Sequence, residues 1–347
     1  MRPALLAVLP IILGVAAHKT AHTEEEKQVE RSLRNAAYHC AAAVGDFTTA
    51  RKRAFAQKAL GQTGNPSVTD YAQLFDQEPL GIEAGPDAEF LSCTPIQDTQ
   101  IENNTCVLTP EVTEGPYYHN AGHPIRQNIA EYQDGLLLLL DIGVIDVETC
   151  KPVPNVLVDI WLANATGHYA GHPDPAPHLV NEQPQVGGSR SGLLSAFPRT
   201  KYQETFLRGA WPTDRNGVSQ FTSIFPGYYT GRATHIHTKV YPEWTVHEEN
   251  STFTGGRLAH VGQWFFEDDI NMAVDKMHPY TENPIRHTRG RTRNWRDSLN
   301  IFDDSHLNGY NPVFKTHLLG GVIGQGVVAY ITMGVNMSAS YDNWWKG

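Results

Sequence analysis

The chain has 347 residues, with 27 Lys or Arg against 37 Asp or Glu, so its formal net charge is −10. This acidic balance argues against a nucleic-acid-binding protein, which usually presents a basic face. A hydrophobic fraction of 40% is that of a folded globule and argues against general disorder. With 30 Gly, 22 Pro and only 18% charged residues, the composition favours turns and strands over long helices.

The first residues have the pattern of a secretory signal peptide. Arg2 precedes an apolar run from Ala4 to Ala17, after which the chain turns polar at His18. The run is shorter than the ~18 residues needed to span a bilayer, and no later segment reaches that length. We therefore expect a signal peptide over residues 1–17 and a secreted, extracellular protein with no membrane partner. The alternative is an uncleaved anchor or a buried helix.

Four cysteines follow this segment: Cys40, Cys93, Cys106 and Cys150. An even number in an oxidising compartment predicts two disulfides, and four cysteines allow three pairings. We favour Cys106–Cys150 within the core and Cys40–Cys93 in the N-terminal part. Four N-glycosylation sequons fit a secreted glycoprotein; they begin at Asn103, Asn164, Asn250 and Asn336.

The mature chain divides into two regions of different composition. Residues 23–60 are rich in Glu, Ala, Lys, Arg and Gln and contain no Pro, which predicts one helix, or two broken near Gly45. Residues 61–104 shift to Gly, Pro, Asp, Asn and Thr, which indicates a loop-rich connector. We therefore expect a helical N-terminal region with its connector over 18–105 and a second domain over 106–347.

In the second domain, short β-branched or aromatic stretches are separated by clusters of Gly, Pro, Asn and Asp. This texture predicts a mainly β fold, an antiparallel sandwich or barrel, and we expect the sandwich. Two long inserts, 169–208 and 268–315, interrupt the strands, and inserts of this size are often functional. The predicted strands are Leu136–Val144, Val156–Trp161, Phe221–Phe225, Thr234–Tyr241, Gln263–Phe266 and Val327–Val335.

The densest chemical signal is an HxH motif on one of these strands. Residues two apart on a strand point to the same face, so His235 and His237 can offer two imidazoles to one metal, while Ile236 faces the core. The alternative is a hydrogen-bonded His pair on a polar sheet face. The neighbouring Gly and Glu residues do not fit the spacing of the cupin motif, which also carries HxH on a sheet.

Two longer motifs make the sequence recognisable. W-x-x-N-x-x-G-x-Y begins at Trp161, and P-G-x-Y-x-G-R-x-x-H-I-H begins at Pro226. In this order they resemble the intradiol ring-cleavage dioxygenases, the catechol and protocatechuate dioxygenase family, and look most similar to its secreted, single-chain fungal-type members. Segments 109–118 and 261–266 also resemble the family, so the resemblance covers roughly residues 106–340.

The resemblance implies an enzyme that uses O2 to cleave the ring of a catecholic substrate between its two hydroxylated carbons. It also implies a mononuclear Fe(III) ion, with the ligands carried over by motif position to Tyr169, Tyr229, His235 and His237. Anionic phenolate suits the harder Fe(III), whereas the common Fe(II) triad is two His and a carboxylate. Binding Tyr as phenolate requires lowering a pKa of about 10, which a trivalent cation supplies.

The resemblance also assigns catalytic groups around the metal. Tyr229 is implied to be the ligand that dissociates and accepts substrate protons, while Arg232 and Gln263 are implied to lie beside the substrate ring. Tyr228 adjoins Tyr229 and faces the opposite way on an extended chain, so it is expected as pocket wall or core, with the swapped ligand assignment as the alternative. The predicted substrate-pocket residues are Tyr117, Tyr118 and Tyr228.

Two other functions are compatible with the same residues. One is a secreted β-sandwich that binds aromatic or polyphenolic ligands without turnover. The other is a zinc or copper enzyme on the same scaffold. Oxygen consumption separates the binding protein from the dioxygenase, and metal analysis separates the second alternative.

Overall fold

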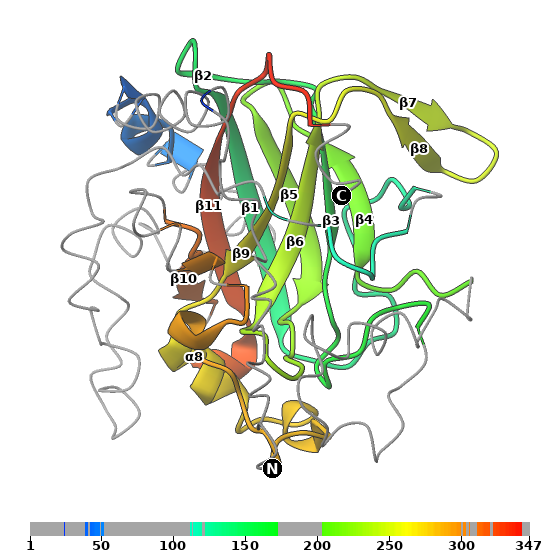
Figure 1. The fold of residues 1–347 in the computed structure, drawn as a ribbon, viewed down its shortest axis with the longest axis vertical. Helices are drawn as coiled ribbons and strands as arrows, with labels where there is room; N and C mark the ends of the chain where they lie inside the picture. The colour runs from blue at the N-terminus through cyan, green and yellow to red at the C-terminus, as the bar shows by residue number, and fades with distance from the viewer. Residues whose placement is uncertain are drawn as a thin grey trace, which may run out of the picture.

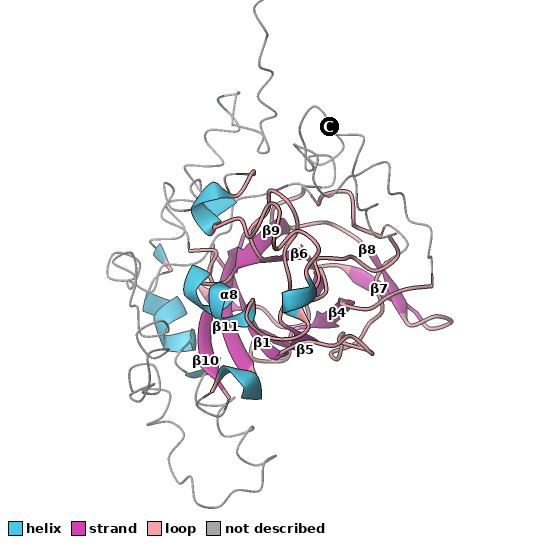
Figure 2. Cartoon of the chain, turned by 90° about the horizontal axis from the view of Figure 1, so that it is seen from below, coloured by secondary structure: helices cyan, strands magenta, loops and turns pink. Residues whose placement is uncertain are grey.

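The computed structural model describes residues 24, 39–40, 42–48, 50–51, 112, 114–119, 122–172, 203–299, 301–302, 305, 311–319 and 322–341. The predicted signal peptide, the connector 61–104, Cys93, Cys106 and the first sequon lie outside these residues. No helix in the described part of the chain combines the length and the apolar character needed to cross a bilayer. The helices are few and short beside the strands and loops (Figure 2).

The first sheet is built around β1, which contains most of a run of five leucines. β1 pairs in parallel with β11 and antiparallel with β2 and β5, and β10 completes the order β10–β11–β1–β2 (Figure 1). The parallel pair departs from the predicted all-antiparallel pairing. The strands of this sheet are β1 Leu137–Asp146, β2 Lys151–Pro152, β5 Val218–Ile224, β10 Lys315–Leu318 and β11 Val327–Val335.

The second sheet is fully antiparallel, in the order β4–β3–β6–β9. Its strands are β3 Leu157–Trp161, β4 Arg208–Pro212, β6 His235–Tyr241 and β9 His260–Phe265. A separate hairpin of β7 Trp244–His247 and β8 Thr252–Gly255 projects from one side of the molecule (Figure 1). All six predicted strands are therefore present, each within a few residues of its predicted bounds.

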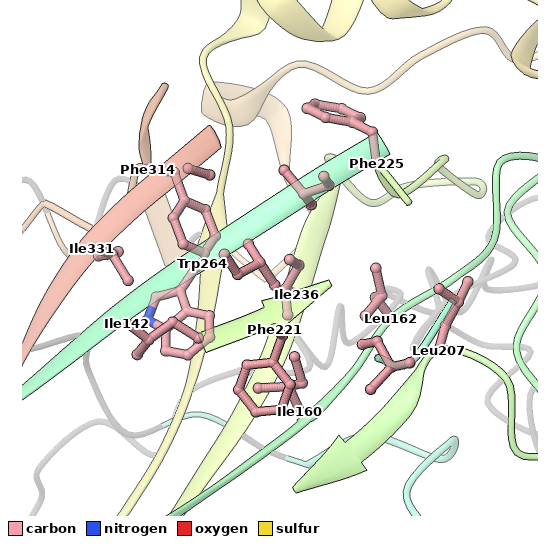
Figure 3. Packing of buried hydrophobic residues seen from close by; sticks show 14 of the residues in the cluster. Ile142, Ile160, Leu162, Leu207, Phe221, Phe225, Ile236, Trp264, Phe314 and Ile331 are labelled. Atoms are coloured by element: carbon pink, nitrogen blue, oxygen red, sulfur yellow. The ribbon is translucent and has the colours of Figure 1, made fainter. Parts of the chain in front are cut away.

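The main hydrophobic core lies between the two sheets. Alternate residues of the second sheet, such as Ile160, Ile236 and Trp264, point inward and pack in one cluster with Ile142 and Phe221 of the first (Figure 3). This alternation leaves the other face of the second sheet free to carry polar side chains, because successive side chains on a strand point to opposite faces. The functional residues lie on that outer face.

The N-terminal region packs against the outer face of the first sheet. Residues 42–48 are helical and continue through Gly45, so the chain is not broken there. Arg51 is buried, and its Nε donates to Asp141 Oδ1 of β1 at 2.8 Å. This contact explains why β1 is buried on both faces.

The favoured pairings of the cysteines were wrong. Cys40 is bonded to Cys150, with a Cα–Cα distance of 5.1 Å. Cys40 lies in a turn shortly before the helical residues 42–48, and Cys150 lies in the turn after β1. Both join one small apolar cluster with Ile145 and Val147. The physical reason is that the N-terminal region docks on β1, which the sequence alone did not indicate.

The second long insert contains regular structure that was not predicted. A short helix, α8 Asp268–Val274, begins directly after β9, with two acidic residues in its first turn. Short 3-10 turns occur within the insert at η1 Tyr280–Glu282 and η2 Asn294–Arg296, and a third, η3 Ile323–Gln325, lies beyond it. After η2, the N–H of Ser298 donates to the carbonyl oxygen of Gly231, so this part of the insert lies beside the loop that precedes β6.

Candidate active site

Strand register places a row of four large side chains on the outer face of the second sheet. Trp161 of β3 is directly opposite Arg208 of β4 on one side and His237 of β6 on the other. His237 is in turn opposite Gln263 of β9. Directly opposed residues share a face, so the register alone brings a histidine of the HxH motif next to an aromatic ring and a glutamine. The Trp161 and His237 rings are stacked, with centroids 4.7 Å apart.

His235 presents an unprotonated ring nitrogen to His237. The Nδ1 of His235 is 2.6 Å from the carbonyl oxygen of Ala233. A carbonyl only accepts, so Nδ1 carries the proton and the lone pair of Nε2 is left facing His237 Nε2 at 3.1 Å. Burial lowers the pKa of both imidazoles well below its usual value, which keeps them neutral at pH 7. For His235 this is the tautomer and charge state of a metal ligand, while the Nδ1 of His237 is buried and has no hydrogen-bond partner among the described residues.

Two tyrosines from different loops complete this group. Tyr169 follows the turn after β3, and Tyr229 follows β5. The hydroxyl of Tyr169 is 3.4 Å from His235 Nε2 and 3.2 Å from His237 Nε2, and the hydroxyl of Tyr229 is 3.4 Å from His235 Nε2. The structure therefore brings together the four predicted ligands, and we call them the Tyr2His2 cluster.

Two glycines hold the tyrosine loops against each other. Gly167 and Gly227 each lie two residues before a tyrosine of the cluster. The N–H of Gly227 donates to Asn164 O at 3.0 Å, and a Cβ on Gly227 would lie 2.6 Å from that same oxygen. Gly167 has φ +85°, and a Cβ there would lie 2.9 Å from the carbonyl carbon of Tyr228. Only glycine allows the two loop backbones to approach this closely.

The donor set of the Tyr2His2 cluster fits a ferric ion. Burial raises the pKa of Tyr169 and Tyr229, although Arg232 opposes the rise at both. Four potential ligand atoms gather here, with neighbouring atoms 3.1–3.4 Å apart, and the lone pair of His235 Nε2 faces inward. A trivalent cation bound among them would displace the phenolic protons, and two phenolates would balance most of its charge.

Arg232 and Gln263 lie beside the cluster. One terminal nitrogen of Arg232, Nη1, is 3.4 Å from the hydroxyl of Tyr229, and the other, Nη2, donates to Gln263 Oε1. Guanidinium only donates, so the contacting atom of Gln263 is its oxygen, which fixes the orientation of the amide. The Nε2 of Gln263 is buried and has no hydrogen-bond partner among the described residues.

The three predicted pocket tyrosines have different surroundings. Tyr117 stacks on Tyr169 with centroids 4.4 Å apart and contacts Tyr229 edge-on, so it covers the cluster. Tyr118 turns away, because its hydroxyl donates to Asp159 Oδ2 at 3.0 Å. The ring of Tyr228 packs against Ile285, with the Arg291 guanidinium 4.3 Å from its centroid. The structure thus brings Tyr117 alone of the three to the Tyr2His2 cluster.

Sequence reasoning missed a buried polar network next to this row. His123 Nδ1 donates to Asp159 Oδ1 at 2.5 Å, and burial lowers the pKa of His123. Lys239 contacts the Tyr118 ring and Glu114. His172 is also buried, with its ring edge-on to Tyr117. Because side chains alternate along β3 and β6, Asp159 and Lys239 lie on the same face as the histidines, and this alternation could have revealed the network from the sequence.

The known proteins that this chain resembles include intradiol, catechol and protocatechuate dioxygenases. No protein-family model matches the chain. A solved intradiol ring-cleavage dioxygenase from Tetranychus urticae is 27% identical with a TM-score of 0.51, over 68% of this chain and 98% of that one. The chain is thus similar in sequence and fold to intradiol ring-cleavage dioxygenases.

Curated relatives match over shorter stretches. A catechol 1,2-dioxygenase from Acinetobacter baylyi is 31% identical over 134 residues, which cover 37% of this chain and 40% of that protein. The beta chain of a protocatechuate 3,4-dioxygenase from Burkholderia cepacia is 28% identical over 167 residues, or 46% of this chain and 56% of that one. The chain therefore spans only about half the length of the curated family members it matches.

Proposed function

We propose that the protein is a mononuclear ferric dioxygenase that cleaves catecholic rings between the two hydroxylated carbons, with O2 as the second substrate. The observation that carries this proposal is the convergence of two phenols and two neutral imidazoles at 3.1–3.4 Å. This donor set favours Fe(III) over the metals that prefer carboxylate or thiolate ligands. The iron, when bound, withdraws electron density from a catecholate and makes its ring reactive toward dioxygen.

The surrounding residues hold the ligands in place. Ala233 fixes the tautomer of His235, and Trp161 stacks on His237, so neither imidazole is free to rotate. Tyr169 lies beneath the ring of Tyr117. This preorganisation means that the ligand atoms need little rearrangement when metal enters.

Tyr229 is the tyrosine best placed to move a proton. A catechol must lose two protons to bind as a dianion, and a phenolate oxygen can accept one of them. Tyr229 lies within 3.4 Å of the Arg232 guanidinium, which stabilises its anionic form against the effect of burial. We therefore assign Tyr229, rather than Tyr169, as the proton acceptor.

Arg232 and Gln263 would stabilise negative charge that develops on the substrate ring. Arg232 is buried, so its charge acts in a medium of low dielectric and is not screened by water. Gln263 has its Nε2 donor free among the described residues while its oxygen is held by Arg232. Together they offer one fixed cation and one oriented N–H donor next to the cluster.

We also propose that the protein acts outside the cell. The disulfide between Cys40 and Cys150 supports this location, because structural disulfides persist mainly in oxidising compartments. Expression of the full chain in a secreting host tests the proposal. Recovery of processed protein from the medium would support it, and retention of unprocessed protein in cells would contradict it.

The activity is tested on protein purified without chelators. We expect one iron per chain, a reddish absorption band from tyrosinate-to-iron charge transfer, and oxygen uptake with catechols that yields a muconate-type diacid. Tyr229→Phe should abolish most of the uptake, whereas the neighbouring Tyr228→Phe is a matched control because its ring packs on Arg291 instead.

Three results would contradict the proposal. Zinc or copper in place of iron would indicate another metalloenzyme on this scaffold. Catechol binding without oxygen uptake would indicate a binding protein. Unchanged uptake in Tyr229→Phe would remove the assigned role of that residue.

A further inference from the structure

A carboxylate outside the recognised motifs contacts the site cation. Asp297 follows η2 and is buried. Its Oδ1 and Oδ2 lie 3.1 Å and 3.0 Å from the Nε of Arg232. This edge of the guanidinium is separate from the two terminal nitrogens, which face Gln263 and Tyr229. Arg232 is therefore held at one end by an anion while its other end is directed at the cluster.

The carboxylate of Asp297 is itself fixed by the backbone. Its Oδ2 accepts the N–H of Ala233 at 2.7 Å, and its Oδ1 accepts the N–H of Leu299 at 3.0 Å. The N–H of Ser298 also donates to the carbonyl oxygen of Gly231 at 2.9 Å. These contacts join residues 297–299 to the loop that leads into β6, so the position of the carboxylate does not depend on Arg232.

The Arg232 contacts set the direction of the Gln263 amide. If the guanidinium rotated away, Gln263 Oε1 would lose its donor and the amide could turn over, because a side-chain amide has nearly the same shape in both orientations. The turned amide would point an acceptor, rather than a donor, at the place where negative charge develops. A buried guanidinium with no anion is also strongly disfavoured, so it would move to find another partner.

We propose that Asp297 is a positioning residue for the ring-cleavage site. It fixes the Arg232 guanidinium and, through it, directs the Nε2 donor of Gln263 toward the substrate. The side-chain hydrogen bonds of Asp297 among the described residues go to Arg232, Ala233 and Leu299 and not to the cluster, so its effect passes through Arg232. This inference rests on the proposed ring-cleavage function.

The main test is Asp297→Asn, which keeps the shape of the side chain and removes its charge. We expect kcat to fall about 10- to 100-fold, the range typical of residues that orient a metal site from outside. Iron content and the charge-transfer band should be retained, because the four ligands keep their own contacts. KM should change less than kcat, because the lost interaction acts mainly on the developing charge.

Asp141→Asn is the matched control. Asp141 also pairs with a buried arginine, Arg51, but on the other sheet. It should lower stability while leaving kcat and the absorption band unchanged. Equal falls in kcat in the two variants would overturn the proposal, because they would reflect general destabilisation.

A double-mutant cycle tests whether Asp297 acts through Arg232. In an Arg232→Met background, Asp297→Asn should lower kcat by less than twofold, because residues that act as a unit are not additive. A further fall as large as in the wild-type background would overturn the proposal. The double variant removes the buried charge together with its partner, so it remains informative if Asp297→Asn alone does not fold.

A readout on iron-free protein separates this inference from the proposed activity. The Nε–H of Arg232 should give a slowly exchanging nitrogen-15 NMR signal in the wild type that shifts and exchanges faster in Asp297→Asn. An unchanged signal would overturn the inference. If the wild type takes up no oxygen but the signal changes as expected, the proposed function fails while the positioning contact stands.

Discussion

Substituting Gly227 with alanine should damage the metal site without touching any ligand. The added Cβ would lie 2.6 Å from Asn164 O and 2.6 Å from the carbonyl carbon of Ala165. Ordinary contacts begin near 3.4 Å, so the two loop backbones must separate by roughly 1 Å. Tyr169 and Tyr229 lie on opposite sides of this contact, so the separation pulls the two phenols apart.

The expected cost follows from two contributions. Inserting a methyl group into a packed site costs about 1–3 kcal/mol. The hydrogen bond from Gly227 N–H to Asn164 O would be stretched, and its loss costs about 1 kcal/mol. Gly227→Ala should therefore lower the free energy of unfolding by about 2–4 kcal/mol and reduce bound iron well below one per chain.

Gly290→Ala isolates the cost of backbone conformation. Gly290 has φ +68°, but the nearest atom to an added Cβ is 3.9 Å away. Its substitution should cost only about 1–2 kcal/mol and leave iron content unchanged. The unfolding free energies of both variants are compared by urea denaturation, which requires that the two variants unfold with the same m value. Bound iron is measured in parallel. If Gly227→Ala were no less stable than Gly290→Ala and kept its iron, the tyrosine loops would not depend on their close approach.

Three further changes test other parts of the structure. Asp141→Asn leaves buried Arg51 without its anion and should lower the free energy of unfolding, measured by chemical denaturation, by about 3–5 kcal/mol. A smaller decrease would show that water reaches the pair. Cys150→Ser opens a disulfide that joins residues 110 apart and should cost about 2–5 kcal/mol, unless the unfolded chain stays compact. Burial raises the pKa of Tyr280 in the folded protein above its value of about 10 in the unfolded chain. The neutral Tyr280 side chain therefore contributes its full stabilisation below about pH 10, and this stabilisation is lost as the pH rises toward the pKa of the folded protein. Tyr280→Phe should remove this loss of stability at alkaline pH. At pH 7 it should lower the free energy of unfolding by about 1–3 kcal/mol, because the N–H of Leu136 and the carbonyl oxygen of Phe225 lose their hydrogen-bond partner. Denaturation at pH 7 and pH 11 checks both expectations.

The strands were predictable where they are buried. The runs that became β1, β3 and β11 are rich in Val, Ile and Leu, and the structure buries nearly all of their residues. β4 was missed because its sequence, Arg-Gly-Ala-Trp-Pro, has no alternating apolar pattern. The parallel pairing of β1 with β11 was also missed, because local patterns carry no information about which distant strands become neighbours.

The candidate site shows the same limit. His235 and His237 could be placed together because a strand has a period of two, and the motifs located the tyrosines. Asp297 could not be found in this way. It lies in a long insert with no motif around it, and only the fold of η2 brings it to Arg232.

The parallel pair of β1 and β11 also affects how this chain is made. β1 is synthesised early in the β domain and β11 near its end, yet each fills a central place in the same sheet. During translation the leucine run of β1 stays unpaired on this edge until β11 has been synthesised. Non-local pairing of this kind slows folding and exposes an apolar edge to other chains. Premature termination anywhere before Val327 would therefore yield a product that cannot complete its first sheet and is prone to aggregate.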